Sequence, residues 1–302
     1  MKKLLKGLGA AIGYILVYII VSILVAIAGS IAYGIIAGIA AFKTDSPLNS
    51  IFDGFRNNMS DSLAIFTIIA GLISLFIYWL IIIAGKKTIK ERLDLIPVSL
   101  HKLWPIIPLG IFFNLFIANL LAVLPLPDRL IQDYAEASSD IQGITPAIVL
   151  SVVLMAPVLE EVLFRGLVFK SLHRGMPLIP ALILQALVFG LLHGQIIWIC
   201  YATLLGIALG ITKARYVSLY PCILFHLAFN GWNYIMVPVY NLLPDSNLVN
   251  IAISVVSAVI IVLLGILIFR KTARVEHAYL AESAEDILSS EDTGLQSFVD
   301  YE

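Results

Sequence analysis

Two adjacent carboxylates, Glu160 and Glu161, lie in the middle of an otherwise apolar stretch that runs from Pro146 to Gly166. A charged side chain at the depth of a bilayer costs roughly 2.5–3.5 kcal/mol on insertion scales. Arg165 adds a third charge to the same stretch, so packing is a poor explanation for the set. Ionisable residues inside a membrane segment indicate a functional site.

The two glutamates are predicted to differ in role. Glu161 and Arg165 are spaced i, i+4 with the acid first, which is the favourable order for an ion pair on one helix face. That pair is interpreted as a structural contact that tethers the helix near its cytoplasmic side. Glu160 lies about 100° around the helix from Glu161 and must point elsewhere. Without a charge partner on its own helix, Glu160 is a candidate general base or acid.

Further polar residues occur at helical spacing in the apolar segments that follow. Phe189 and His193 are four residues apart, and so are His226 and Asn230, so each pair shares one helix face. A lone membrane histidine is more often a hydrogen-bonded contact between helices than a catalyst. Two histidines, one asparagine and an unpaired glutamate, in a solvent that penalises each of them, together indicate a catalytic centre.

Three short patterns in this part of the chain resemble a known family signature. They are Glu160-Glu161-x-x-x-Arg165, Phe189-x-x-x-His193 and His226-x-x-x-Asn230. Together with the glycine-bearing stretch 205–210 and the basic loop after it, they resemble the CAAX-protease and bacteriocin-processing (CPBP) intramembrane proteases of bacterial type. The resemblance covers roughly residues 145–235.

This resemblance implies an eight-helix membrane protein that hydrolyses peptide bonds within or beside the bilayer. By position, Glu160 would be the base that activates water, with His193 helping to orient it. His226 and Asn230 would donate hydrogen bonds to the tetrahedral oxyanion, where one donor is worth about 10²–10³-fold in rate. Glu161, Arg165 and Phe189 would support the site.

The sequence leaves the metal dependence of such a site open. Glu160, His193 and His226 could form a three-ligand catalytic zinc site with water in the fourth position. However, the chain has no His-Glu-x-x-His helix, and the three ligands would come from three separate helices. A glutamic protease without a cofactor is therefore favoured over a zinc metalloprotease.

The composition predicts an all-α polytopic membrane protein, since 60% of the residues are hydrophobic and only 13% are charged. Eight apolar runs are long enough to span a bilayer. They lie near 8–42, 63–85, 104–125, 147–169, 177–194, 196–212, 217–237 and 249–269. The first run is too long for one straight span, so a tilt or a kink is expected.

Basic residues set the expected orientation, because positive charge is retained in cytoplasmic loops. Fifteen of the nineteen Lys and Arg residues fall on one side when both termini are cytoplasmic. The predicted organisation is N-terminal membrane helices and loops (1–140), a protease core (141–240), a last membrane helix (241–274) and an acidic cytoplasmic tail (275–302). The expected location is the cytoplasmic membrane of a cell.

The expected partners are the lipid bilayer and a peptide or membrane-protein substrate, with a membrane-associated or leader peptide favoured. A net charge of −1 gives no argument for nucleic acid. A bacteriocin-immunity or other non-enzymatic role is an alternative, and a proton-coupled transporter is another. A transporter is disfavoured because no inverted repeat is visible.

The expected depth of His193 is a difficulty. It lies sixteen residues after Pro177, about 24 Å along a helix, which places it near the opposite face from the cytoplasm. Either the fifth helix begins inside the cytoplasm, or the Gly194-Gln195 turn dips into the membrane, which is allowed where backbone is buried in protein.

Overall fold

The computed structural model describes residues 1–44, 59–85, 88–139, 143–240, 244 and 246–272, and all regular secondary structure within these ranges is helical. The helices are α1 (Lys2–Thr44), α3 (Met59–Ala84), α4 (Ile89–Leu93), α5 (Leu100–Leu103), α6 (Ile106–Val123), α7 (Asp128–Ser139), α8 (Pro146–Val149), α9 (Ala156–Glu161), α10 (Phe169–His173), α11 (Leu178–Leu191), α12 (Ile196–Tyr216), α13 (Tyr220–Tyr240) and a C-terminal helix, Asn247–Thr272. Two π-helical stretches, η1 (Leu150–Met155) and η2 (Val162–Val168), connect α8, α9 and α10. The predicted acidic tail, 275–302, lies outside the described residues.

Six helices among the described residues are long and apolar enough to cross a membrane. They are Lys2–Ala40, Met59–Ala84, Leu100–Val123, Pro146–His173, Ile196–Tyr216 and Asn247–Thr272. The prediction of an all-α polytopic membrane protein is therefore confirmed. Of the two other predicted spans, the fifth is the 14-residue α11 and the seventh is the 21-residue α13, and neither is among the six.

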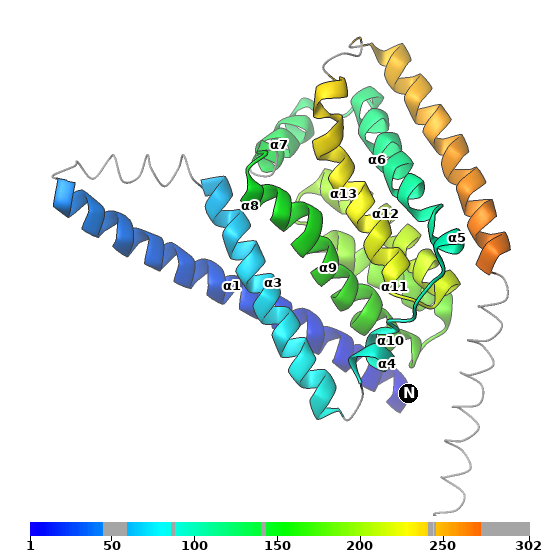
Figure 1. Cartoon of the computed structure of the whole chain (residues 1–302), viewed down its shortest axis with the longest axis horizontal. Coiled ribbons are helices and arrows are strands. Elements are labelled where there is room, and N and C mark those ends of the chain that lie inside the picture. The colour runs from blue at the N-terminus through cyan, green and yellow to red at the C-terminus, as the bar shows by residue number, and fades with distance from the viewer. Residues whose placement is uncertain (45–58, 86–87, 140–142, 241–243, 245, 273–302) are drawn as a thin grey trace, which may run out of the picture.

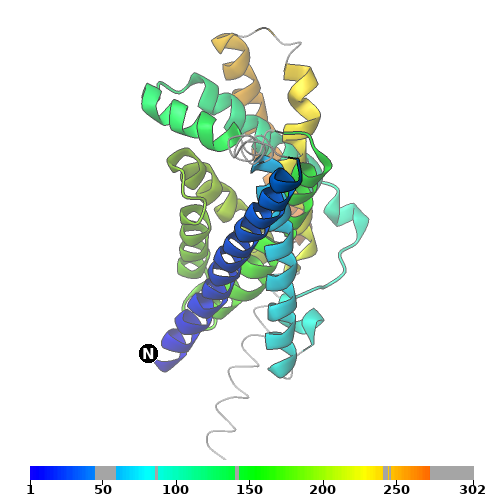
Figure 2. The same ribbon diagram turned by 90° about the vertical axis from the view of Figure 1, so that its left-hand side faces the viewer.

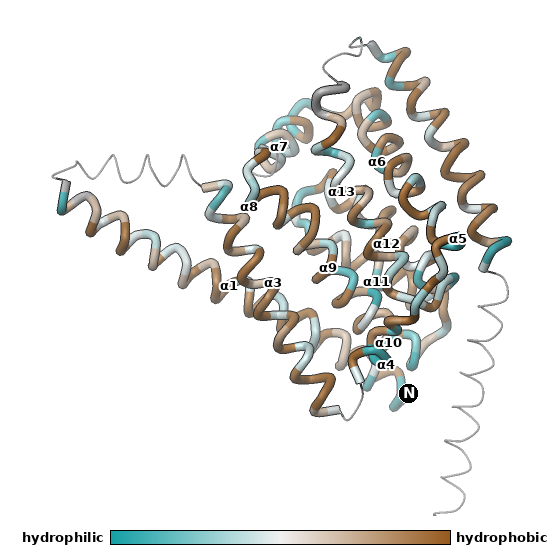
Figure 3. The backbone as a smooth tube through the Cα atoms, in the orientation of Figure 1, coloured by the Kyte–Doolittle hydropathy of each residue, from teal (hydrophilic) through white to brown (hydrophobic). Residues whose placement is uncertain are grey.

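The helices form a bundle in which α6 packs against α13, and α11 against α12. The helix α1 runs obliquely along the side of the bundle and contacts α3, α10 and η2 (Figures 1 and 2). Its 43 residues form one uninterrupted helix of about 65 Å, which is twice the thickness of a bilayer core. Figure 3 shows the helices hydrophobic along most of their length, with hydrophilic residues gathered in α7 at one end and near α4 at the other.

The span that carries the two glutamates, Pro146–His173, departs twice from α-helical hydrogen bonding. It begins at Thr145, whose side chain caps the amide of Ile148, with Pro146 in the first turn. In η1 the amide of Ala156 donates to the carbonyl of Ser151, five residues back. In this five-residue pattern the carbonyl of Val152 would accept from the amide of residue 157. Residue 157 is a proline and has no N–H, so this carbonyl has no backbone partner.

The hairpin of α11 and α12 is closely packed because glycines lie between the two helices. A Cβ on Gly206 would lie 3.0 Å from the Cα of Ala186, and a Cβ on Gly190 would lie 2.7 Å from the carbonyl oxygen of Ile199. Such small residues let helix backbones approach within a membrane. The turn between the helices contains Gly194, with a φ of 74°, a conformation that glycine adopts without strain.

Polar contacts tie together one end of the bundle, which we call the basic end. It consists of the segment 88–105, the start of α1 and the last turns of α10, α12 and the C-terminal helix. The carboxylate of Asp94 accepts from the Nζ of Lys170 at 2.5 Å and from the Nζ of Lys213 at 2.7 Å. The guanidinium of Arg215 donates to the carbonyl of Phe269 at 2.9 Å. In Figure 1 the N-terminus lies at the same end, beside α4 and α10.

The other end of the bundle, which we call the opposite end, consists of the start of α3, helix α7, the start of α8 and the last turns of α13. Here the hydroxyl of Thr145 donates to the carboxylate of Asp61. The ring of Tyr134 on α7 packs edge-on against that of Trp198 on α12, with centroids 6.5 Å apart. These contacts fix α7 and α3 over the side of the bundle where α12 begins.

Replacing Asp94 by asparagine is expected to destabilise the fold by about 3 kcal/mol, because it leaves the ammonium of Lys213, only 3% exposed, without its counter-charge. Asparagine also tolerates the left-handed backbone conformation at position 94, where φ is 51°. The substitution therefore removes the charge without straining the backbone. Thermal unfolding in detergent measures the effect. Asp133→Asn on the exposed face of α7 is the control, and equal stability of the two variants would contradict the prediction.

Candidate active site

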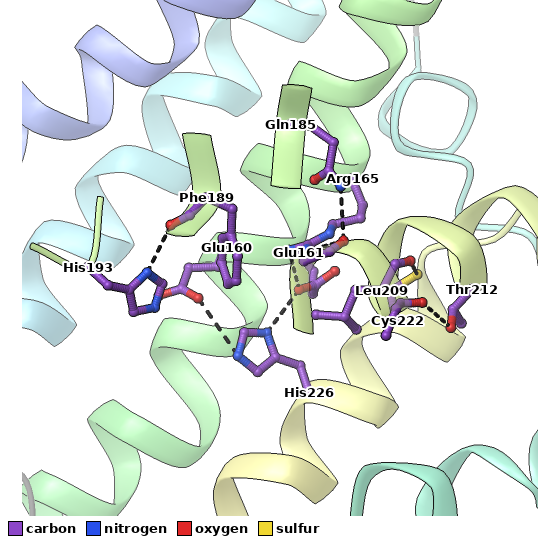
Figure 4. Close-up of polar contacts among 12 residues, drawn as sticks. Glu160, Glu161, Arg165, Gln185, Phe189, His193, Leu209, Thr212, Cys222 and His226 are labelled. Atoms are coloured by element: carbon purple, nitrogen blue, oxygen red, sulfur yellow. Dashed lines mark hydrogen bonds and ion pairs between the residues drawn. The ribbon is translucent and has the colours of Figure 1, made fainter. Parts of the chain in front are cut away.

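The two neighbouring glutamates point into different environments, as their helical offset predicted (Figure 4). The side chain of Glu161 is fully buried, and its Oε1 lies 2.8 Å from the Nη1 of Arg165, which is also fully buried. The side chain of Glu160 keeps 20% of its surface exposed. The predicted ion pair is present, and Glu160 is left to face a pocket.

Glu161 also makes a contact that the sequence did not reveal. Its Oε1 lies 2.9 Å from the Nδ1 of His226, which belongs to α13 and is 65 residues away along the chain. An ionised carboxylate only accepts, so the hydrogen of this bond is assigned to Nδ1. The buried carboxylate therefore fixes the ring orientation of His226 and directs its Nε2 away from Arg165, as a buried aspartate orients the histidine of a serine-protease triad.

Arg165 connects the span 146–173 to the α11–α12 hairpin. Its Nη2 donates to the carbonyl of Gly206 at 3.2 Å, and the Nε2 of Gln185 donates to the same carbonyl at 3.0 Å. The guanidinium lies over the ring of Phe189, 4.5 Å from the centroid, within the range of a cation–π contact. Arg165 thus holds three helices together behind the site. Sequence analysis did not identify Gly206 as its partner or Gln185 as the second donor to that carbonyl.

His193 lies directly after α11 and beside the ring of Phe189, as their shared helix face predicted. Its Nδ1 is 2.8 Å from the carbonyl oxygen of Phe189, and the two rings meet edge to face at 4.9 Å. A carbonyl only accepts, so Nδ1 carries the hydrogen and Nε2 keeps a free lone pair. This nitrogen is suited to accept a hydrogen bond from water.

The turn that carries His193 follows a short helix. The fourteen residues of α11 extend about 21 Å, which is less than the thickness of a bilayer core of about 30 Å. The turn satisfies its own backbone: the amide of Gly194 donates to Leu191, and the side chain of Gln195 caps the amide of Trp198. The position of His193 relative to the membrane stays a prediction with its two alternatives.

His226 and Glu160 face each other across a gap. The Nε2 of His226 lies 3.8 Å from the Oε2 of Glu160, beyond ordinary hydrogen-bond distance. Candidate catalytic groups are often further apart in an empty site than in a substrate complex. The spacing leaves the Oε2 of Glu160 accessible to another hydrogen-bond donor.

Asn230 lies one turn beyond His226 on α13, and its position depends on the proline in the neighbouring helix. Its Nδ2 donates to the carbonyl of Val152 at 2.8 Å, the same carbonyl that Pro157 leaves without a backbone partner. The amide carries two hydrogens, so one remains after this bond. The bond fixes the side-chain orientation of Asn230 beside the pocket.

A pocket of about 280 Å³ brings the four predicted catalytic residues together. They share its wall with residues that sequence analysis did not identify, from α3 (Ser60, Leu63, Ala64, Thr67), from the start of the glutamate-bearing span (Ile148, Ser151, Val152, Ala156), from α12 (Trp198, Tyr201, Ala202, Leu205) and from α13 (Phe229, Asn233). Asn233 carried a usable signal, because a polar residue in an apolar run requires a partner, and its Oδ1 accepts from Asn114 of α6 at 2.9 Å.

The three residues considered as zinc ligands do not form a metal-binding arrangement. Within the described ranges, no group of three or more His, Cys, Asp and Glu side chains is placed so that it could hold a metal ion. The predicted set Glu160, His193 and His226 therefore does not fit zinc with this geometry.

Part of the chain is similar to known proteins. Residues 142–232 match the family described as type II CAAX prenyl endopeptidase Rce1-like. A curated protein of Bacillus subtilis (strain 168), named "Putative membrane peptidase YdiL", is 26% identical over 182 residues, which cover 59% of this chain and 74% of that protein. No solved structure matches the chain. Residues 142–232 thus carry the Rce1-like type II CAAX prenyl endopeptidase (CPBP) family match, and the chain is a distant homologue of the Bacillus subtilis protein.

Proposed function

We propose that this multi-pass membrane protein is an intramembrane endopeptidase in which Glu160 activates the attacking water. One observation carries the proposal: of two adjacent glutamates, one is fully buried and paired, whereas the other is partly exposed in a pocket that also contains both histidines and Asn230. A positioned carboxylate of this kind contributes about 10²–10⁴-fold to the rate as a general base.

The geometry assigns a separate task to each side chain. The Oε2 of Glu160 takes a proton from a water that the Nε2 of His193 helps to orient. The hydroxide attacks the scissile carbonyl, and the proton held on Glu160 passes to the leaving amine when the tetrahedral intermediate collapses. Asn230 donates the second hydrogen of its amide to the oxyanion, and His226 adds a donor from Nε2 when its ring carries a hydrogen on both nitrogens.

The residues behind the pocket keep these groups in place. Glu161 holds the ring of His226, and Arg165 holds Glu161 while it bonds the carbonyl of Gly206. Because Arg165 bonds Gly206 of α12 and Glu161 bonds His226 of α13, these two contacts restrict the rotation of the span that carries Glu160. The site is thus supported by side chains whose own rotamers are fixed, which is what precise catalysis requires.

We further propose that the chain crosses the membrane eight times with both termini in the cytoplasm. The helices α11 and α13 are the additional spans, and the short α11 crosses only part of the bilayer core. The basic end then faces the cytoplasm, where positive charge is retained. This assignment corresponds to the cytoplasmic membrane of a cell.

Peptide hydrolysis by the purified protein is the direct test. The detergent-solubilised chain is incubated with quenched CAAX-type and leader-type peptides, with and without a strong zinc chelator. Cleavage that resists the chelator is the expected result, since the described side chains form no metal cluster. Cleavage that the chelator removes and zinc restores would overturn the glutamic mechanism. No cleavage of any peptide would count against the endopeptidase assignment.

A further inference from the structure

Polar side chains form a column along the face of α13 that lines the pocket. His226, Asn230 and Asn233 follow one another at intervals of four and three residues, so they share that face. The proposed mechanism uses the first two and gives no task to Asn233. This third side chain is exposed and belongs to the pocket wall. The column therefore continues about 4.5 Å along the helix beyond Asn230.

A buried asparagine of the neighbouring helix fixes the orientation of the Asn233 amide. The helices α6 and α13 pack side by side (Figure 1), and Asn114 of α6 is 4% exposed. Its Nδ2 donates to the carbonyl of Phe229 at 3.0 Å and to the Oδ1 of Asn233 at 2.9 Å. A backbone carbonyl only accepts, so Asn114 turns its NH₂ to both partners, and Asn233 must present its oxygen. The NH₂ of Asn233 consequently points away from α6.

The two hydrogens of this NH₂ are not used by the protein. Within the part of the chain that the structure describes, the Nδ2 of Asn233 donates to no acceptor. A contact between α6 and α13 needs only the oxygen of this amide, so helix association does not explain its donor side. Amide donors are costly in apolar surroundings unless a group accepts from them. We therefore expect an acceptor from outside the chain at this point of the pocket.

A peptide that presents its scissile carbonyl to Asn230 also offers an acceptor at the distance of Asn233. A helical peptide bonds its carbonyls internally, so the segment at the site must be extended. In an extended chain, carbonyls two residues apart point the same way and lie about 6.6 Å apart. Side chains three residues apart on a helix face are about 5–6 Å apart at their Cβ atoms. The interval from Asn230 to Asn233 thus corresponds to two residues of substrate.

We infer that Asn233 is a substrate-binding residue whose NH₂ donates to the backbone carbonyl two residues from the scissile bond, with Asn114 as the positioning residue that holds the amide. The inference rests on the proposed peptidase function and adds to it a contact outside the reacting atoms. Because the bond is made to the backbone, it fixes the register of the peptide and does not depend on its side chains. It is present before and during the reaction, so its loss raises KM and leaves kcat nearly unchanged.

The first test replaces Asn233 by leucine, which has a similar volume and no donor. The probe is the peptide of the quenched panel that the parent cleaves fastest. The Asn233→Leu variant is expected to raise KM about 10-fold, the effect of one lost hydrogen bond, with kcat within about 2-fold of the parent. Asn119→Leu is the matched control, because Asn119 is a buried asparagine of α6 that does not line the pocket. The control should keep the parental KM.

The second test removes the acceptor from the substrate. Two peptides carry an alkene in place of one peptide bond, so that the carbonyl two residues before or two residues after the scissile bond is absent. One of them is expected to raise the parental KM about 10-fold and to have no further effect on the Asn233→Leu variant, because both changes remove the same bond.

An unchanged KM of the Asn233→Leu variant would overturn the inference, and so would a loss confined to kcat. Equal effects of the alkene peptides on the parent and on the variant would overturn it as well, since an asparagine with only a structural role does not couple to one substrate carbonyl. In each of these cases the parent still cleaves its peptide, so the proposed function stands. A parent that cleaves no peptide would contradict the proposed function instead.

Discussion

The Glu160→Gln variant is expected to lose peptide hydrolysis by about 10²–10⁴-fold in kcat while its folding is unchanged. Glutamine keeps the size of the side chain but takes up no proton from water, so the general base is removed. The free energy of unfolding should remain within about 0.5 kcal/mol of the parent, because the side chain is partly exposed and its Oε2 is 3.8 Å from His226. Single-turnover cleavage assays and thermal unfolding in detergent give the two measurements.

A matched control for this prediction is Glu136→Gln, the same chemical change on the exposed face of α7. That variant should cleave peptides at the parental rate. Hydrolysis by the Glu160→Gln variant at a rate comparable to that of the Glu136→Gln variant would refute the role of Glu160 as the base. A large loss of stability in the Glu160→Gln variant would show that the carboxylate supports the fold instead.

The Glu161→Gln variant, one residue away, is expected to show a loss of stability of about 3–5 kcal/mol. Glu161 neutralises Arg165, and both side chains are fully buried, so the substitution leaves a guanidinium without a counter-charge. The ring of His226 also loses its ionised acceptor. Thermal or chemical unfolding in detergent measures the effect, with the Glu160→Gln variant as the neighbouring comparison.

A double variant separates the charge effect from the loss of packing. Glu161→Gln combined with Arg165→Met removes both charges and keeps most of the volume, so it should recover a substantial part of the stability lost in the single variant. Recovery of stability without recovery of activity is expected, because His226 still lacks its ionised partner. If the single variant is as stable as the parent, the pair does not have the structural role assigned to it.

The sequence by itself determined where the long apolar helices form and which of their polar side chains share a helix face. Apolar runs of about 20 residues predicted the membrane class, and the structure describes helices across all eight of them. The i, i+4 spacings were sufficient for the Glu161–Arg165 ion pair and for the contact of Phe189 with His193. These are local consequences of helical periodicity, which depends only on positions close together in the chain.

Only the tertiary structure decided which helices meet at the site. The bond between Glu161 and His226 joins residues 65 positions apart, and helical periodicity shows the face on which a residue lies but not the helix opposite that face. The wall contributed by α3 has the same origin, since its residues carry no catalytic motif.

The meeting of His193 with Glu160 was also a tertiary result. The two residues come from different helices, and the structure places both in the wall of one pocket. Close packing through Gly190 and Gly206 sets how α11 lies against α12, and no local pattern predicts that arrangement. The sequence therefore supplied the chemistry of the site, and helix packing determined its geometry.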